Sequence, residues 1–215
     1  MTKYHKIQSV FKRDPETKYK TFLAEYSMPA FEYLADSMWI WTEKIEGMNM
    51  RAIWNEQNVS EFGLEPSFRF AGRTDRAQVP GDLLDTMMGL FSAEMVDAGV
   101  VDDEVIFYGE GFGGSIQRGK HEYGTEKRFV LFDISVNGRF LPFYDVINIG
   151  EACGLDVVDS KSGSLQDAIE FVRAGFPSKY GGQAEGLVLR PLVELYDQYG
   201  NRVIAKVKTR DFPNG

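Results

Sequence analysis

The stretch Glu43-Lys44-Ile45-Glu46-Gly47-Met48-Asn49 joins two apolar runs, Trp39-Ile40-Trp41 and Met48 to Trp54, and each run is typical of a buried strand. Lys44 therefore stands at the edge of an apolar core, where a lysine is costly unless the protein uses it. Burial favours the neutral amine, which is the nucleophilic form of a lysine. Gly47 permits close backbone approach or an unusual φ at the turn. Because Lys-x-x-Gly is a short pattern, the alternative interpretation is a solvated Lys/Glu pair at a strand end.

The composition predicts one soluble globular domain. The chain has 215 residues, of which 43% are hydrophobic and 26% charged, and we expect a single domain over 1–215 with no additional C-terminal domain. A single cysteine, Cys153, excludes an intrachain disulfide, and the two histidines argue against a His-based metal cluster. No stretch approaches the roughly 20 apolar residues of a membrane span, and the first residues, Met1 to Lys6, show no apolar h-region of a signal peptide. We therefore expect a cytoplasmic, intracellular protein with no membrane partner.

The net charge of -8 argues against general nucleic-acid binding through bulk electrostatics. Any nucleic-acid contact of such an acidic chain must depend on a local basic patch or on a metal ion.

Hydrophobic periodicity predicts more strands than helices. Strand patterns occupy 67–73, 104–110, 128–134, 184–191, 193–196 and 202–208, with a weaker one at 4–12. Helical patterns begin near Ser27, Pro80, Asp145 and Ser164; the second extends to Gly99, the third to Ala152 and the last to Gly175. Asn137-Gly138 predicts a tight hairpin. Because most neighbouring strands are close enough in sequence to pair antiparallel, we predict an α+β fold of antiparallel sheets packed with helices.

Several charged residues lie at the end of, or inside, apolar strands. Glu110 precedes a glycine-rich bend, where a carboxylate can accept hydrogen bonds from sugar hydroxyls or hold a metal. Glu185 is a candidate to orient a divalent ion, because Mg²⁺ prefers one or two carboxylates together with phosphate oxygens. Lys206 and Lys208 are two residues apart and share one face of a strand, which suits a triphosphate.

Arg73 and Phe132 complete the set of candidates. Arg73 follows an apolar strand and a glycine, and could reach a phosphate, whereas Phe132 could stack on a base. Each candidate also has a structural interpretation: a loop-edge acid, a solvent-facing strand or a core phenylalanine. Their order along the chain is more specific than any one of them.

In that order the segments resemble the motifs of the covalent nucleotidyltransferase superfamily of ATP-dependent ligases and capping enzymes. The resemblance runs from about Thr42 to Phe212 and implies the ligase adenylyltransferase fold, an ATP-grasp-like arrangement around a nucleotide cleft. The segments that resemble motifs I, III, IIIa, IV and V are, in turn, Lys44-Ile45-Glu46-Gly47, Tyr108-Gly109-Glu110-Gly111, Leu131-Phe132-Asp133-Ile134, Ala184-Glu185-Gly186-Leu187-Val188-Leu189 and Lys206-Val207-Lys208.

Two details resemble the RNA ligase 2-like branch of this superfamily. Asn49 stands five residues after Lys44, where DNA ligases tend to have arginine, and the run from Gly109 to Gly119 is similar to that of RNA ligases. The resemblance implies an ATP-dependent RNA ligase of RNA repair, with ATP and Mg²⁺ or Mn²⁺ as cofactors. Lys44 would form lysyl-AMP and release pyrophosphate, AMP would pass to an RNA 5′-phosphate, and a 3′-hydroxyl would displace it.

The resemblance also implies residue roles. Lys44, Lys206 and Lys208 would be catalytic, the last two by stabilising charge on the α-phosphate. Glu110 would bind the ribose, Phe132 would stack on adenine, and Glu185 would serve the metal. The implied nucleotide-binding residues are Glu43, Glu46, Asn49, Arg73, Glu110, Phe132, Glu185, Lys206 and Lys208.

Substrates implied by the resemblance are RNA 5′-phosphate and 3′-hydroxyl ends, including those of a nicked duplex. Family members commonly carry a further domain after motif V, whereas here Thr209 to Gly215 follow it. An accessory protein or domain that docks the substrate is therefore an implied partner, and a phage-encoded origin is compatible with this branch.

Three alternatives remain open at this point. A DNA ligase or a GTP-dependent mRNA capping guanylyltransferase would share the covalent lysine. A catalytically inactive nucleotide-binding protein would not need it. The presence together of Lys44, Glu110, Glu185, Lys206 and Lys208 favours an enzyme.

Overall fold

The computed structural model describes all residues except 1–2, 56–67, 93–94, 96–103, 117–120 and 213–215. Contacts divide the chain into two compact units: unit 1 comprises 1–4 and 46–158, and unit 2 comprises 5–45 and 159–215. One boundary passes between Ile45 and Glu46, inside the segment that contains Lys44.

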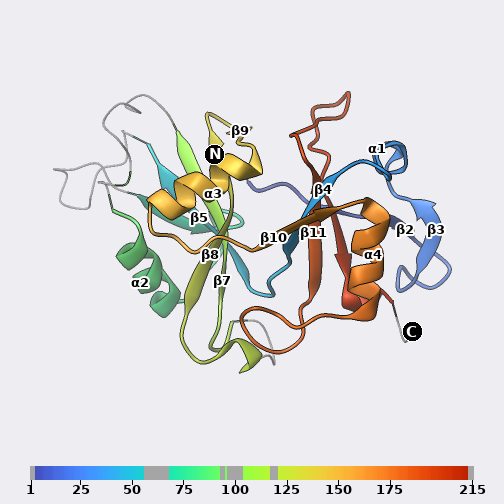
Figure 1. The fold of residues 1–215 in the computed structure, drawn as a ribbon. Coiled ribbons are helices and arrows are strands. Elements are labelled where there is room, and N and C mark those ends of the chain that lie inside the picture. Colours follow the sequence, from blue (N-terminus) through green and yellow to red (C-terminus); the bar gives the residue numbers. More distant parts are fainter. Residues whose placement is uncertain (1–2, 56–67, 93–94, 96–103, 117–120, 213–215) are drawn as a thin grey trace. The chain divides into compact units, whose positions relative to one another are not determined.

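Unit 1 is built on a five-stranded antiparallel sheet of order β6-β5-β7-β8-β9 (Figure 1). Its strands are β5 (Met48–Trp54), β6 (Arg69–Gly72), β7 (Val105–Phe112), β8 (Arg128–Val136) and β9 (Arg139–Phe140), and its helices are α2 (Gly81–Leu90), α3 (Phe143–Ala152) and the 3-10 turn η2 (His121–Tyr123).

Helices α2 and α3 cover one face of this sheet. A Cβ built on Gly111 of β7 would lie 2.6 Å from Leu83 of α2, and one built on Gly150 of α3 would lie 3.0 Å from Leu131 of β8. Because both helices pack on this face, the polar residues of the sheet lie on the opposite face. On that face Asn49 pairs with Glu110, and Arg51 pairs with Tyr108.

Unit 2 contains a second five-stranded sheet, of order β1-β12-β11-β4-β10. All its pairings are antiparallel except β1 with β12. The elements of this unit are β1 (Gln8–Ser9), β2 (Phe11–Arg13), β3 (Phe22–Tyr26), α1 (Pro29–Tyr33), β4 (Trp39–Glu43), β10 (Ser160–Gly163), α4 (Leu165–Ala174), β11 (Gly186–Pro191), β12 (Ala205–Lys208) and the 3-10 turn η3 (Thr209–Asp211). Strands β2 and β3 form a separate hairpin.

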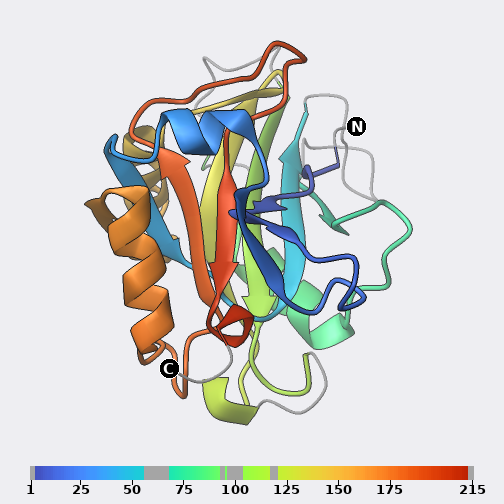
Figure 2. The same cartoon turned by 90° about the vertical axis from the view of Figure 1, so that its right-hand side faces the viewer.

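One face of the unit 2 sheet forms a hydrophobic core with α1 and α4 (Figure 2). Trp39 and Trp41 of β4 lie in this core together with Leu187 and Leu189 of β11, because alternate residues of a strand point to the same face. Four helical residues fill it from the α4 side: Leu165, Ala168, Ile169 and Val172.

The predicted α+β fold of antiparallel sheets is confirmed. The Asn137-Gly138 hairpin is confirmed as well, with both residues at positive φ (49° and 77°), as a two-residue turn between twisted strands requires. Ser164 caps α4 as predicted, and Gly175 follows its last turn.

Three predictions about local elements are wrong: the strand at 193–196, the start of the strand at 202–208, and the cap at Ser27. Residues Val193 to Tyr196 form no strand: Tyr196 makes one isolated bridge with Arg202, and the strand expected at 202–208 begins only at Ala205. Val193 is 61% exposed, so no packed face supports its apolar pattern. Ser27 does not cap α1; Met28 takes the N-cap position, and the Ser27 hydroxyl donates to the carbonyl of Ser9 instead.

The helix predicted from Pro80 is shorter than expected. It ends at Leu90, because Phe91 takes an extended conformation, and the expected end at Gly99 lies outside the described residues. Leu83 and Met87 are buried, whereas Met88 is 61% exposed, so the apolar stripe is narrower than the methionine pattern indicated.

In the part of the chain that the structure describes, every helix falls short of the length and apolar character needed to cross a bilayer.

We predict that Ser164→Ala destabilises unit 2 by about 1 kcal/mol, the usual contribution of an N-cap. The Ser164 hydroxyl accepts from the Asp167 N–H at 3.1 Å, and the Asp167 carboxylate accepts from the Ser164 N–H at 3.0 Å. Urea unfolding followed by tryptophan fluorescence measures the loss, since Trp39 and Trp41 share a core with α4. The exposed Ser162 offers a matched control, Ser162→Ala, and equal stability of the two variants would contradict the prediction.

Candidate active site

Lys44 and Lys208 converge on one carboxylate in unit 2. Lys44 follows β4 and extends its pairing, since its N–H donates to the Gly186 carbonyl at 2.8 Å. Lys208 ends β12, in register with Gly186. The Lys44 ammonium lies 2.5 Å from one oxygen of Glu185, and the Lys208 ammonium contacts the other oxygen. Three predicted site residues, distant in sequence, are thus joined by direct contact.

Gly186 makes this convergence possible because it occupies the position between the two lysines without a side chain. Its φ is +149°, and a Cβ there would lie 2.1 Å from the Val207 carbonyl oxygen. The backbone of Glu185 is fixed by Thr209, whose N–H donates to the Glu185 carbonyl at 2.9 Å. The Thr209 hydroxyl donates to the Ala184 carbonyl at 3.1 Å.

Burial alone would raise the pKa of Glu185, but the charges of Lys44 and Lys208 and their hydrogen bonds outweigh it, so the pKa of this carboxyl is below its usual range. Glu185 therefore stays ionised at neutral pH. A carboxylate with a lowered pKa stabilises the fold above its ordinary pKa and loses that contribution as the pH falls through the folded-state value.

Lys206 lies on the face that carries Lys44 and Lys208, since residues two apart on a strand point the same way. Within the described residues it takes part in no ion pair. Burial, followed by repulsion from Lys208, Lys44 and Lys6, lowers the pKa of Lys206 to about 8 against an opposing effect of Glu185. The group thus holds four cations near one carboxylate, an excess of positive charge that attracts an anion.

Glu43 lies apart from this group. It belongs to β4 but points to the opposite face from Lys44, and its carboxylate accepts a hydrogen bond from the backbone N–H of Lys179 at 3.2 Å. That contact gives Glu43 a role in anchoring the loop at Lys179. Its predicted place among the nucleotide-binding residues receives no support from this geometry.

In unit 1, Asn49 and Glu110 are cross-strand partners on β5 and β7, so their side chains are neighbours on one sheet face. Both are partly exposed. The Asn49 Oδ1 atom is buried and has no hydrogen-bond partner among the described residues. A buried acceptor without a partner is costly, and a ligand donor would satisfy it.

Phe132 lies where the pairing of β7 with β8 shifts its register, and its ring meets that of Tyr4 edge-on at 5.2 Å. The ring contributes to an aromatic cluster, and because it is partly exposed, part of it remains accessible to a ligand.

Glu46 donates its backbone N–H to the Tyr123 hydroxyl at 3.5 Å. Arg73 lies on an exposed turn directly after β6, and Gly47 approaches the backbone of Gly111, where a Cβ would come within 2.3 Å.

Sequence reasoning missed Arg51, a buried arginine on β5. Its Nε donates to the Gly72 carbonyl at 2.8 Å, and its Nη2 pairs with Asp75 at 2.7 Å, which fixes the end of β6 just before Arg73. The signal that could have found it was the one used elsewhere, a charge inside an apolar strand. The same signal marks Asp133, fully buried on β8, which accepts from the Tyr4 hydroxyl at 2.7 Å.

A second missed residue, Asp211, holds the backbone of Lys208. One carboxylate oxygen accepts from the Lys208 N–H at 3.0 Å, and the other accepts from Arg13 Nη2 at 3.0 Å. Asp211 is buried, so this link between η3, β12 and β2 is shielded from solvent. No motif pattern in the sequence pointed to it.

The donor set limits which metal ion could bind. Among the described residues, no three His, Cys, Asp or Glu side chains gather into a metal cage. Glu185 offers one carboxylate between two ammonium groups. This set fits an ion that takes most of its ligands from phosphate oxygens and water, as Mg²⁺ does.

Residues 37–208 match the family model described as RNA ligase. Comparison with curated protein sequences gives no significant match.

Among solved structures, the Naegleria gruberi RNA ligase with PPi is similar, with a TM-score of 0.67 and 16% identity over 97% of this chain and 56% of that chain. A mutant of that ligase with ATP and Mn has a TM-score of 0.63 and 17% identity over 85% and 54% of the two chains. At such identities the likeness concerns the fold. The chain spans about half the length of the solved ligase chains it matches.

We predict that Lys206→Met stabilises the fold at pH 7 by on the order of 1 kcal/mol, because it removes a partly buried cation from among three others. The gain shrinks as the pH rises from about 8, since native Lys206 then loses its proton while the unfolded chain still binds one. Urea unfolding at pH 7 and pH 9.5 (roughly one unit below an unperturbed lysine) measures the difference. The exposed hairpin residue Lys20 provides the control Lys20→Met, and a gain equal at both pH values would refute the assignment.

We predict that Glu185→Gln costs about 2 kcal/mol at pH 7, because it leaves the Lys44 and Lys208 ammonium groups without a counter-charge. The gap between wild type and variant should close as the pH falls below about 4.3, where the unfolded carboxyl gains its proton. Unfolding midpoints from pH 7 to pH 3.5, within the range in which carboxyls titrate, test this. A gap that widens in acid would show that Glu185 stabilises by some other means.

Proposed function

The chain belongs to the RNA ligase family, and from this premise we propose that it is an ATP-dependent RNA ligase that acts through a lysyl-AMP adduct at Lys44. The observation that carries the proposal is the contact of Lys44 and Lys208 with the two oxygens of Glu185. This arrangement places a primary amine beside a fixed acceptor and a second cation, which are the groups that attack on a phosphate needs.

In the first step, the Lys44 nitrogen forms a bond to the α-phosphorus of ATP. The bond from that phosphorus to the oxygen bridging to the β-phosphate breaks, and pyrophosphate leaves with the electron pair. Glu185 orients the amine and is the nearest acceptor for its proton, at 2.5 Å. Its lowered pKa keeps Glu185 ionised at neutral pH, which suits it to hold the Lys44 amine in position more than to act as a strong base.

Lys206 and Lys208 stabilise the negative charge on the α-phosphate during this step. Both come from β12, so their spacing is set by the strand rather than by a mobile loop. Asp211 holds the Lys208 backbone and thereby limits its movement. A divalent ion such as Mg²⁺ or Mn²⁺, held by Glu185 and phosphate oxygens, would neutralise phosphate charge there.

For the nucleoside we propose the residues on the polar face of the unit 1 sheet. Glu110 would accept hydrogen bonds from ribose hydroxyls, and Asn49 would use its unpartnered Oδ1. Phe132 would stack on adenine with its exposed part. Glu46 and Arg73 would contact the transferring phosphate or the ribose.

The later steps belong to the proposal as well. AMP passes from Lys44 to the 5′-phosphate of an RNA end, and a 3′-hydroxyl then attacks that phosphorus and expels AMP. The substrates are RNA ends, including those of a nicked duplex. Because the chain spans about half of the solved ligases, we also propose that a further domain or partner protein docks the RNA. We propose that residues 1–215 act together as one nucleotidyltransferase domain.

We predict that wild-type protein incubated with labelled ATP and Mg²⁺ forms a covalent AMP adduct, and that Lys44→Ala forms none because the nucleophile is gone. Denaturing gels and intact-protein mass spectrometry detect the adduct. Lys20→Ala, an exposed lysine of the same unit, should label like wild type. Labelling of Lys44→Ala would place the nucleophile elsewhere.

Other nucleotides and substrates separate the alternatives. A label from GTP alone would indicate a capping guanylyltransferase, and no label from either nucleotide would indicate a binding protein. Nicked duplexes with RNA or DNA on the 3′-hydroxyl side then distinguish an RNA ligase from a DNA ligase.

A further inference from the structure

Large apolar side chains are exposed together at one end of unit 2. Single exposed apolar residues are ordinary on a protein surface, whereas a group of them marks an interaction site. Of the described residues, nine large hydrophobic side chains are exposed, and six of these come from residues 33–38 and 192–199. We call the six the apolar patch, and their exposed fractions range from 49% to 89%: Tyr33, Met38, Leu192, Val193, Tyr196 and Tyr199.

The two segments of the apolar patch are neighbours in space. The Leu192 N–H donates to the Met38 carbonyl at 3.1 Å. Beneath them, Leu34 and Leu195 pack against the same hydrophobic core. Figures 1 and 2 both show α1 and the loop between β11 and β12 at the same end of the unit. The six side chains therefore belong to one surface at this end of the core.

The loop between β11 and β12 is held in place by its own polar residues. Arg202 is buried, and its guanidinium donates to both carboxylate oxygens of Glu194 at 2.6 Å. Asp197 accepts from the N–H groups of Tyr199 and Asn201, at 2.9 and 2.8 Å. A surface that is fixed before binding loses less entropy when a partner binds, so this loop is suited to present its apolar side chains.

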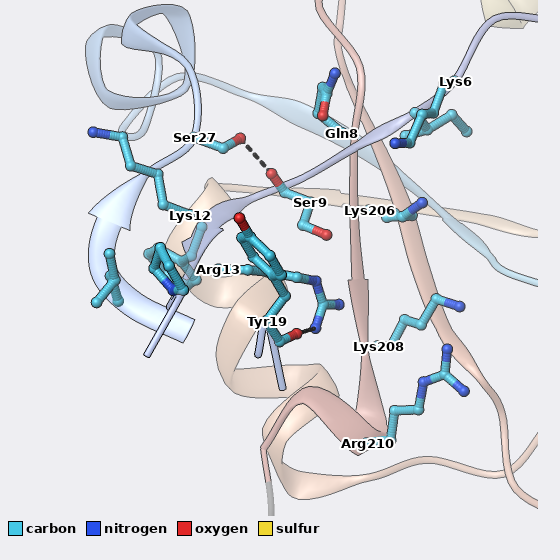
Figure 3. Close-up of a pocket in the computed structure, with 14 residues that line it drawn as sticks. Lys6, Gln8, Ser9, Lys12, Arg13, Tyr19, Ser27, Lys206, Lys208 and Arg210 are labelled. Carbon is cyan, nitrogen blue, oxygen red and sulfur yellow. Dashed lines mark hydrogen bonds between the residues drawn. The ribbon is translucent and has the colours of Figure 1, made fainter. Parts of the chain in front are cut away.

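The surroundings of the apolar patch are acidic. Residues 29–39 and 191–201 contain four acidic residues and neither lysine nor arginine. Glu32 and Asp36 are exposed, and Asp197 is partly exposed. Several cations of unit 2 instead line a cleft near the other end of β11, where Figure 3 shows Lys6, Lys206, Lys208 and Arg210.

This combination of apolar and acidic side chains discriminates between classes of partner. The phosphodiester backbone of RNA and anionic lipid headgroups would be repelled by acids with no cation among them. A second copy of the chain, bound about a two-fold axis, would bring the same acidic residues face to face. A protein surface with apolar side chains bordered by cations complements the patch in both respects.

We propose that the apolar patch is the docking surface for a partner protein whose contact face carries apolar side chains bordered by lysines and arginines. Such a partner brings positive charge to a chain whose own net charge is -8. RNA binding depends on that kind of charge. The identification of this partner with the one that docks RNA rests on the proposed function, whereas the docking surface itself does not.

The apolar patch lies away from the lysines of the candidate active site. Strand β11 connects the two places, because Gly186 pairs with Lys208 at its start and Pro191 pairs with Trp39 at its end. The steps from Gly186 to Pro191, at about 3.3 Å each, separate the two ends by roughly 17 Å. A partner on the patch therefore leaves Lys44 uncovered.

The test uses the full chain and a synthetic amphipathic peptide with leucine on one helical face and lysine on the other. A peptide with glutamate in place of lysine is the charge control. Leu192→Ser/Tyr199→Ser removes apolar surface, and Asp36→Lys reverses one exposed charge. Tyr144→Ser, at a tyrosine that is 71% exposed on α3, is the matched control. All these positions are exposed, so circular dichroism and urea unfolding should match wild type.

We expect wild type to bind the lysine peptide, more weakly at higher salt, with hydrogen-exchange protection at residues 33–38 and 192–199. Fluorescence anisotropy should show binding about tenfold weaker for Leu192→Ser/Tyr199→Ser, because exposed tyrosines contribute strongly at interfaces, and about threefold weaker for Asp36→Lys. Tyr144→Ser should bind like wild type. Equal binding to wild type and the double variant, or equal binding of the glutamate peptide, would overturn the proposal.

Two further measurements identify other occupants. A wild-type dimer in sedimentation experiments that the double variant abolishes would assign the apolar patch to a second copy of the chain. Weaker binding of RNA by the double variant alone, without any partner, would assign it to RNA. Either result would overturn the proposal.

Adduct formation from ATP separates this proposal from the proposed function. Wild type and all the variants should form the adduct at the same rate, because the apolar patch lies at the far end of β11 from Lys208. Peptide binding without any adduct in wild type would refute the proposed function alone, and an adduct without peptide binding would refute the docking surface alone. Slower adduct formation in the double variant would show that the patch supports the active site and would also overturn the proposal.

Discussion

The shared carboxylate of Glu185 is the interaction on which the candidate site depends. Two lysines, one following β4 and one ending β12, come together only because β11 lies between these strands in register. The two ammonium groups repel each other, and the Glu185 carboxylate offsets this repulsion because it attracts both of them. A side chain at Gly186 would collide with the backbone of Val207 and Lys208, so the pairing of β11 with β12 that brings Lys208 to Glu185 depends on a glycine at this position.

Both units divide their sheets in the same way. One face is apolar and packs against helices, while the other carries charged and polar residues: Asn49, Arg51 and Glu110 in unit 1, and Lys44, Lys206 and Lys208 in unit 2. Strand alternation enforces this division, since each buried apolar residue places its neighbour on the other face. Glu43 and Lys44 illustrate the effect, because adjacent residues serve a structural loop and a candidate nucleophile.

Residue patterns predicted the elements that depend on local sequence. The strands around Lys44, the Asn137-Gly138 turn and the Ser164 cap all follow from neighbouring residues. The convergence of Lys44, Glu185 and Lys208 was found through order and resemblance, since spacing alone does not set sheet neighbours. Asp211 was missed because its partner Arg13 is defined by a tertiary contact, whereas Arg51 carried the signal of a charge inside an apolar strand and was overlooked. The strand predicted at Val193 to Tyr196 does not form, because an alternating apolar pattern does not reveal whether other elements will cover its apolar face.

The parallel pairing of β1 with β12 joins residues 8–9 to residues 205–206, nearly the full length of the chain. Unit 1, by contrast, pairs strands that mostly follow one another in sequence. Loop-closure entropy makes such distant pairings form late, so we expect unit 1 to acquire structure earlier during synthesis. The sheet that carries Lys44 at the end of β4 is completed only after β12 leaves the ribosome. A chain that still lacks β12 would therefore carry Glu185 without its contact to Lys208.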